Sequence, residues 1–357
     1  MRILFGIPYK EHLEIALSEV DAFRNLGAEV EVSDYSNSGK VAGVFKSFIL
    51  VLKNAIKIKR KVIKHKTDIV YLNTSLDRKT LIRDSISIFL IKLFNNRTKV
   101  VLKVHGSEET IVRANSILKR YVFGHADIFL LLSKEEKANF LRAGLDERKA
   151  LITANPIDTT AYKPDPAFKE KLGMPANVIV LLFVGRLMET KGILDLVEAC
   201  KLLEKHQIDY RLFCLGSGPL ESAIKQAISE DGVSKIKLTG YIPEDDTKYY
   251  YSNCDIMILP TYHSEGFPMA VFRAIAAGKA VITTRIRAAA DYLEENKNCL
   301  WVNKQDPTDL YNKIVELTEN ETLRLNMGLN NLSLAREFTA ERIAQNFMEL
   351  YAATDKT

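Results

Sequence analysis

The sequence predicts an α/β protein with two parallel β-sheets, each in a domain of its own. Short apolar runs alternate with helical segments twice along the chain, which is typical of parallel strands covered by helices on both faces. Prolines and weak periodicity separate the two runs between Asn155 and Met174. The length of 357 residues suits two domains. We therefore expect two Rossmann-like domains.

The first domain opens with a β-α-β unit. Ile3–Ile7 is a short apolar run followed by Pro8, and Glu11–Leu26 has apolar side chains at helical spacing before Gly27. Glu29–Val32 is then the second strand. The other elements predicted in this domain are strands at Asp68–Leu72, Lys99–Val104, Ile128–Leu132 and Leu151–Thr153, and a helix at Ser116–Phe123.

The second domain repeats this alternation. Val178–Val184 is an apolar run of strand length, and the segment after Gly192 has helical periodicity. Ala340–Ala353 predicts a final helix. The other elements predicted here are strands at Arg211–Leu215, Lys235–Leu238, Ile256–Leu259 and Ala280–Thr283, and helices at Gly192–His206, Leu220–Ile228 and Thr247–Ser252.

Composition is that of a soluble globular protein. Apolar residues make up 47%, charged residues 27%, and the net charge is +5, which suits anionic partners without choosing among them. The four cysteines form no C-x-x-C pair, so we expect buried free thiols in a reducing cytoplasm. The apolar part of the N-terminus is too short for a signal peptide, and no run is long enough to span a membrane. We expect a cytoplasmic protein.

A loop with one carboxylate follows the predicted strand Ile256–Leu259. Glu265 lies in this loop, and a short helix follows it and ends at Gly278. In an open α/β sheet, a loop that leaves the carboxyl end of a strand and begins a helix is where ligands bind. The free N–H groups of the helix start attract an anion. A carboxylate there is unsuited to phosphate and suits the hydroxyls of a sugar.

Two cations lie in the loop after the strand Val178–Val184. Arg186 and Lys191 follow Gly185, and a helix begins at Gly192. The helix dipole adds to the field of both cations, so the loop could bind a diphosphate. The alternative is a solvated pair of charges in an ordinary loop.

Together these segments resemble the donor-binding motifs of the retaining glycosyltransferases of family four, glycosyl transferases group 1, which have the GT-B fold. The spacing G-R-x4-K-G is similar to the family's pyrophosphate motif. Glu265 matches the first of two signature Glu residues, and Arg273 occupies the second position. The resemblance implies two Rossmann-like domains facing each other across a cleft: 1–160 on the acceptor side, 161–338 on the donor side, and a helix at 339–357 that crosses back.

The resemblance extends to other positions of the second domain. It implies that Gly216, in a G-x-G-P turn, lines the donor cleft, although a tight turn alone would explain this glycine. It places Tyr241 and Ile242 beside the nucleotide base, where ordinary core packing is the alternative. Gly266 and Phe267 would offer backbone N–H groups to the sugar.

Arg273 departs from the family pattern. Arg has donors only and cannot accept the ribose hydrogen bonds that the resemblance assigns to a Glu. We expect Arg273 to lie near the ribose or the phosphates; the alternative is that it turns away and leaves the ribose to a backbone carbonyl. Asp245 and Asp246 resemble half of a metal-binding D-x-D, but their position after Pro243 favours an N-cap, so we expect no metal.

Two positions of the first domain are candidates for the site. His105 follows the strand Lys99–Val104, and the resemblance implies that it orients the transferred sugar or stabilises developing charge; a structural His is the alternative. Gly6 would let the backbone approach the phosphates and the acceptor, although relatives often have two adjacent glycines there.

A basic amphipathic segment covers Lys46–Lys66. It predicts a helix that could rest on an anionic membrane surface, or an exposed helix whose lysines keep the protein soluble. We expect no nucleic-acid binding, because the sequence has neither a stacking-aromatic array nor a recognised motif.

The resemblance implies transfer of a sugar, with retention, from a nucleotide-diphosphate donor to a hydroxyl of a glycan or lipid-linked acceptor, in the synthesis of cell-surface polysaccharide or glycoconjugates. Glu265, His105, Arg186 and Lys191 would be the catalytic residues, and the nucleotide sugar would be a substrate with no cofactor. The alternatives are a non-catalytic sugar-nucleotide-binding relative and a sugar-nucleotide epimerase, which would turn over the donor without an acceptor.

Overall fold

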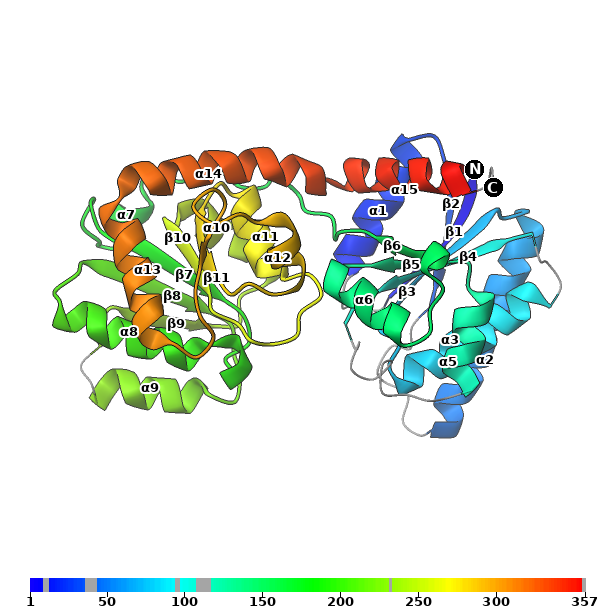
Figure 1. The fold of residues 1–357 in the computed structure, drawn as a ribbon, viewed down its shortest axis with the longest axis horizontal. Helices are drawn as coiled ribbons and strands as arrows, with labels where there is room; N and C mark the ends of the chain where they lie inside the picture. The colour runs from blue at the N-terminus through cyan, green and yellow to red at the C-terminus, as the bar shows by residue number, and fades with distance from the viewer. Residues whose placement is uncertain (9–12, 36–43, 94–96, 107–116, 231–232, 355–357) are drawn as a thin grey trace. The chain divides into compact units, whose positions relative to one another are not determined.

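The computed structural model describes residues 1–8, 13–35, 44–93, 97–106, 117–230 and 233–354. The chain divides into two compact units (Figure 1). The first unit comprises Met1–Pro156 and Phe338–Thr357, and the second comprises Ile157–Glu337. The chain therefore leaves the first unit once and returns to it at its end.

The first unit is built on a parallel sheet with the strand order β2-β1-β3-β4-β5-β6. In the register of the sheet, Phe5 lies opposite Val32 on one side and Tyr71 on the other. Strands β3 and β5 are buried along their whole length, which is why they appear in the sequence as short apolar runs. The strands are β1 (Arg2–Ile7), β2 (Glu29–Asp34), β3 (Ile69–Thr74), β4 (Lys99–Val104), β5 (Ile128–Leu131) and β6 (Ala150–Ile152).

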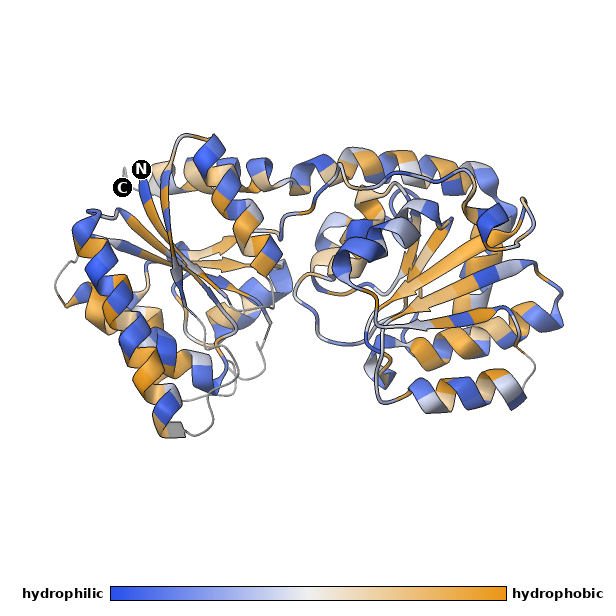
Figure 2. Ribbon diagram, turned by 180° about the vertical axis from the view of Figure 1, so that it is seen from behind, coloured by the Kyte–Doolittle hydropathy of each residue, from blue (hydrophilic) through white to orange (hydrophobic). Residues whose placement is uncertain are grey.

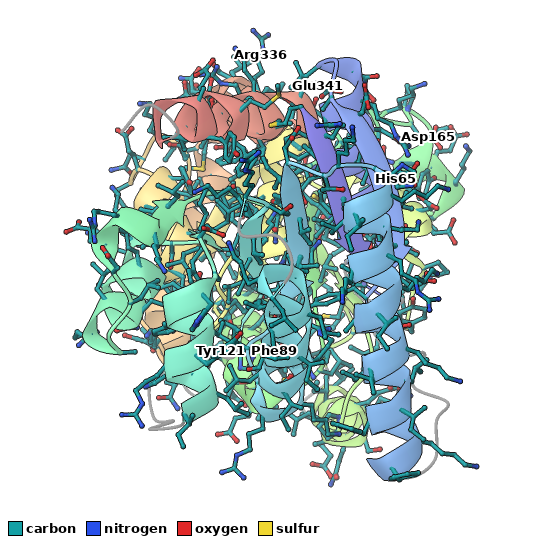
Figure 3. The ribbon with its side chains drawn as sticks, turned by 90° about the vertical axis from the view of Figure 1, so that its right-hand side faces the viewer. His65, Phe89, Tyr121, Asp165, Arg336 and Glu341 are labelled. Carbon is teal, nitrogen blue, oxygen red and sulfur yellow. The ribbon has the colours of Figure 1, made fainter. Side chains whose placement is uncertain are left out.

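Helices cover both faces of this sheet. On one face, the rings of Phe23 and Phe347 are 5.6 Å apart, and Phe347 also contacts Tyr71, so the last helix of the chain packs on the first. On the other face, α2, α3 and α5 lie side by side (Figure 3). The helices are α1 (Leu13–Asn25), α2 (Val44–Lys64), α3 (Arg78–Lys92), α5 (Ile117–His125), α6 (Lys134–Arg142) and α15 (Ala340–Thr354).

The second unit has a parallel sheet with the order β12-β11-β10-β7-β8-β9. The chain runs outward from β7 to β9 and then returns to the other side of β7, where β10 pairs with it. This reversal creates a topological switch point between β7 and β10. The strands are β7 (Ile179–Val184), β8 (Tyr210–Leu215), β9 (Ile236–Gly240), β10 (Ile256–Leu259), β11 (Ala280–Thr283) and β12 (Leu300–Trp301).

The apolar strands of the second unit lie between helices that are polar on their outer faces (Figure 2). The four cysteines are buried here as free thiols, as predicted, and burial raises the pKa of each. The helices are α7 (Phe168–Lys171), α8 (Ile193–Lys205), α9 (Glu221–Glu230), α10 (Glu244–Asn253), α11 (Met269–Ala276), α12 (Arg287–Tyr292), α13 (Pro307–Glu319) and α14 (Glu321–Ala335).

One predicted helix start is wrong. Helix α10 begins at Glu244, directly after Pro243, so Asp245 and Asp246 lie in its first turn and neither is the N-cap. Both carboxylates still interact favourably with the positive end of the helix dipole. The predicted helix starts at Glu11 and Ser116 lie outside the described residues.

A buried carboxyl group starts α6. Glu136 is buried, its Oε2 accepts a hydrogen bond from the backbone N–H of Leu132 at 2.6 Å, and the N-cap Ser133 accepts one from the N–H of Glu136. The Ser133 bond satisfies an N–H group in the first turn of the helix, and the Glu136 bond satisfies the N–H of the residue before the N-cap. Burial raises the pKa of Glu136 from 4.5 to about 7.

This raised pKa predicts a pH-dependent stability. Because the folded state holds the proton more tightly than the unfolded chain, the stabilisation is fully present below pH 4.5 and is lost as the pH rises to about 7. Relative to Glu136→Gln, the free energy of unfolding of the wild type should fall by about 3 kcal/mol across that window. Denaturant unfolding of both proteins at pH 4.5 and pH 8 checks this, and identical pH dependence in the two would contradict it.

Candidate active site

The candidate site of the second unit lies at the carboxyl ends of β7 and β10. The loop after β7 supplies Gly185, Arg186 and Lys191, and the loop after β10 supplies Glu265. Strands β7 and β10 lie on either side of the switch point, and in open α/β sheets such a point is where ligands bind.

Glycines let these loops touch backbone to backbone. Gly216, after β8, has φ 135°, and a Cβ there would lie 2.0 Å from the carbonyl oxygen of Gly185. Gly192, at the start of α8, has φ 70°, and its Cβ would lie 2.2 Å from the carbonyl oxygen of Pro260. Any side chain would push the loops apart, so each glycine is required by a close approach as well as by its φ.

Backbone hydrogen bonds extend this frame across four loops. The N–H of Gly216 donates to the carbonyl of Gly240 at 2.8 Å, which joins the loops after β8 and β9. The N–H of Leu187 donates to the carbonyl of Ser217 at 3.1 Å, and that of Tyr262 donates to the carbonyl of Thr190 at 2.9 Å. The side chains carried by these loops therefore have fixed positions relative to one another.

Lys191 and Glu265 form an ion pair at the centre of the frame. The Lys191 ammonium donates to Glu265 Oε1, although the two residues are 74 positions apart in the sequence. The side chain of Lys191 is 10% exposed and that of Glu265 is 20% exposed. Thr261 is buried between the loops: its hydroxyl lies 3.1 Å from the carbonyl of Thr190 and 3.4 Å from Glu265 Oε1.

The loop after β10 is anchored on both sides of Glu265. The Ser264 hydroxyl accepts a hydrogen bond from the Arg287 guanidinium, and the carbonyl of Gly266 accepts one from the N–H of Ala288. The ring of Phe267 is buried and stacks on Phe272 with 3.8 Å between centroids. These contacts hold the Glu265 carboxylate at the rim of the site.

The remaining candidates of this unit surround the same edge of the sheet. Arg186 is exposed. The side chain of Tyr241 is 75% exposed, and Ile242 beside it is partly buried, so the pair forms an open surface after β9.

Arg273, on α11, forms an ion pair with Glu244 in the first turn of α10. Sequence analysis placed Arg273 against a ribose or phosphate; the structure adds a protein carboxylate as its partner.

His105 and Gly6 lie in the first unit, at the carboxyl edge of its own sheet. His105 directly follows β4, and its Nε2 lies 2.8 Å from Asn73 Oδ1. Gly6 lies within β1, and a Cβ there would be 2.7 Å from Leu72 and 3.1 Å from Tyr35, so packing already explains this glycine.

Sequence analysis missed three residues of these sites. Thr261, Glu244 and Asn73 are single polar residues near strand or helix ends, and no spacing or motif distinguishes them. Their importance follows from partners on other loops, which only the fold reveals.

No group of three or more His, Cys, Asp or Glu side chains within the described ranges could hold a metal ion. The helices in those ranges also include none that is long and apolar enough to cross a membrane.

The second unit matches a known family of domains. Residues 164–332 match Glycosyl transferases group 1. The chain is 29% identical over 268 residues to an uncharacterized glycosyltransferase of Methanocaldococcus jannaschii, covering 72% of this chain and 70% of that protein. It is 29% identical over 259 residues to the N,N'-diacetylbacillosaminyl-diphospho-undecaprenol alpha-1,3-N-acetylgalactosaminyltransferase of Campylobacter jejuni, covering 69% of this chain and 66% of that enzyme.

Solved structures share the fold along the whole chain. HepE of Anabaena, crystallised with UDP and glucose, has a TM-score of 0.75 at 19% identity and covers 99% of both chains. A glycosyltransferase of Rickettsia africae has a TM-score of 0.77 at 19% identity, covering 100% of this chain and 99% of that one. The protein therefore has the GT-B fold, with two Rossmann-like domains.

The ion pair between Arg273 and Glu244 predicts a charge-dependent stability. Arg273→Glu would place two carboxylates together and lower the melting temperature, and adding Glu244→Arg should restore it. The coupling in the double-mutant cycle should be on the order of 0.5 kcal/mol, because the pair is partly exposed. Lys237→Glu, an equal charge change at an exposed position of β9, is the control. No recovery in the double variant would contradict the pair.

Proposed function

We propose that this protein is a retaining glycosyltransferase of family four that moves a sugar from a nucleotide-diphosphate donor to a hydroxyl group. The observation that carries the proposal is the pairing of Lys191 with Glu265 at the switch point between β7 and β10. It brings a cation suited to a diphosphate and a carboxylate suited to sugar hydroxyls to one place, and the exposed Arg186 lies in the same loop as Lys191.

Donor binding would exchange the partners of this pair. The diphosphate would take hydrogen bonds from the Lys191 ammonium and the Arg186 guanidinium, and Glu265 would then accept hydrogen bonds from the sugar. The N–H groups of Gly266 and Phe267 would assist at the sugar. Tyr241 and Ile242 would contact the base. UDP is the first nucleotide to test, because HepE of Anabaena was crystallised with it.

The reaction breaks the bond between the anomeric carbon and the diphosphate oxygen and forms one to the acceptor oxygen. Arg186 and Lys191 stabilise the negative charge that grows on the departing diphosphate, so the step needs no metal ion. The departing phosphate oxygen takes the acceptor's proton on the same face of the sugar, which gives retention. Glu265 holds the sugar and is not the nucleophile. His105 would orient the sugar.

The proposed acceptor is a glycan or a lipid-linked glycan, in the synthesis of cell-surface polysaccharide or glycoconjugates. The name of the Campylobacter jejuni relative includes a diphospho-undecaprenol, which supports a lipid-linked acceptor. A cytoplasmic protein that contacts the inner face of the membrane would reach such an acceptor.

Helix α2 offers a surface for this contact. Its exposed apolar side chains include Phe45, Phe48, Ile49 and Leu52. Towards its C-terminal end, a hollow of about 690 Å³ is lined mainly by basic side chains, together with Glu31 and Ile56. Apolar groups beside cations suit an anionic lipid surface. The basic side chains lining the hollow are Lys53, Lys57, Arg60, Lys61, Lys64 and His65.

Membrane contact is tested by sedimentation with vesicles that contain anionic phospholipid. Replacing Lys53, Arg60 and Lys64 by Gln should lower binding, and salt should weaken binding of the wild type, because each cation near the surface contributes about 1 kcal/mol. A control variant carries the same change to Gln at two exposed lysines of the second unit, Lys205 and Lys225. Equal binding of both variants would leave the lysines with a solubilising role.

The donor site is tested by separating its two parts. Lys191→Met should lower the affinity for UDP and for UDP-sugar alike. Glu265→Gln should retain the affinity for UDP and lose sugar transfer, because the carboxylate is assigned to the sugar. Losing one charge-assisted hydrogen bond corresponds to roughly ten- to a hundredfold in affinity. Arg186→Ala should reduce transfer without unfolding the protein. Calorimetry with UDP and with UDP-glucose checks this, and equal losses for both ligands in Glu265→Gln would contradict the assignment.

A further inference from the structure

A polar cluster at the carboxyl edge of the first sheet surrounds His105. The ring Nε2 lies 2.8 Å from Asn73 Oδ1, and the N–H of His105 donates to the carbonyl of Thr74 at 2.7 Å. The ring and the backbone of His105 are therefore both held by the end of β3.

The orientation of the Asn73 amide determines which His105 nitrogen carries the proton. Asn73 Nδ2 donates to the carbonyl oxygen of Gly6 at 3.4 Å, and a carbonyl oxygen only accepts. The amide oxygen of Asn73 therefore faces His105, and it can only accept from Nε2. In the neutral ring, the proton is then on Nε2, and Nδ1 is the acceptor nitrogen.

The backbone of Asn73 is held by Arg83, which pairs with the buried carboxylate of Asp84. Asp84, on α3, is fully buried and accepts hydrogen bonds from the Tyr35 hydroxyl, from Thr74 Oγ1 at 2.5 Å and from Arg83 Nε at 2.9 Å. Arg83 Nη2 also donates to the carbonyl of Asn73 at 3.3 Å. The Asp84 charge is thus matched by Arg83, and both hold the two residues that end β3.

Tyr35 completes the cluster. It follows β2, its ring lies 3.9 Å from the Arg83 guanidinium, and burial raises its pKa, so its hydroxyl remains a donor. Gly6 leaves room for the Tyr35 side chain, which lies 3.1 Å from the position of a Cβ. Three neighbouring strands therefore contribute to one rigid support beneath Asn73.

We propose that Asn73 positions His105 and fixes its Nε2–H tautomer. The importance of this contact for sugar transfer rests on the proposed function, in which His105 orients the donor sugar. The assignment of the tautomer does not depend on that function. With Nε2 committed to Asn73, the neutral ring has an acceptor rather than a donor at Nδ1, and this nitrogen is buried. Asn73 acts through His105 and is a positioning residue.

The tautomer can be measured in the wild-type protein without any substitution. The full chain would be labelled with ¹⁵N-histidine, and its long-range proton–nitrogen NMR spectrum recorded above the pKa of the ring. His105→Gln assigns the signals. We expect His105 to show the pattern of the Nε2–H tautomer, and a dominant Nδ1–H tautomer would overturn the proposal.

Substitution of Asn73 then tests the contact. Asn73→Asp places a carboxylate at Nε2, which favours the charged ring, so the pKa of His105 should rise by about one unit or more. Asn326→Asp adds the same charge on an exposed face of α14 and should leave the pKa unchanged. An unchanged pKa in Asn73→Asp would also overturn the proposal.

Turnover distinguishes this proposal from the proposed function. Asn73→Leu should lower kcat while UDP affinity, measured by calorimetry, stays at the wild-type value. If NMR gives the expected tautomer and pKa shift but His105→Gln keeps full turnover, Asn73 still positions the ring and the catalytic role of His105 fails. If His105→Gln abolishes transfer but the NMR pattern is Nδ1–H, the positioning role of Asn73 fails.

Discussion

The close approach of loop backbones in the second unit is the constraint on which the candidate site depends. Gly216 and Gly192 each bring a carbonyl oxygen from another loop closer than a side chain would allow. Because the loops follow different strands, their contacts are held by the rigid sheet beneath them. Lys191 and Glu265 meet only because this frame fixes both loops, so the chemistry of the site depends on residues that have no side chain.

The structure contains two kinds of charge arrangement. The Lys191–Glu265 pair lies at a loop surface and keeps some exposure, so an incoming anion can compete for the ammonium. The pair of Lys103 with Glu19 is fully buried at 2.7 Å, and Lys103 also donates to the carbonyl of Ala154. Burial lowers the pKa of Lys103, while Glu19 opposes this shift. The first arrangement is suited to exchange with a ligand, and the second is suited to fixing the end of the first unit.

The sequence predicted the buried strands well, because apolar runs and glycine turns are local signals. Glu265, Arg186 and Lys191 were proposed as site residues from the composition of their loops. The sequence could not show that Lys191 pairs with Glu265, that Glu244 meets Arg273, or that Asn73 supports His105. These contacts join loops that are far apart in the chain, and their geometry depends on strand order. The helices α3, α6 and α12–α14 were also missed.

The return of the chain at Phe338 has a consequence for synthesis. Helix α15 is made after the second unit, yet Phe347 packs against Phe23 and Tyr71, which are made before that unit. Until α15 leaves the ribosome, that face of the first sheet is covered by α1 without α15, while the second unit already has all of its own elements. Folding in the order of translation would thus complete the second unit before the first, and the nascent first unit would be the part that chaperones need to protect.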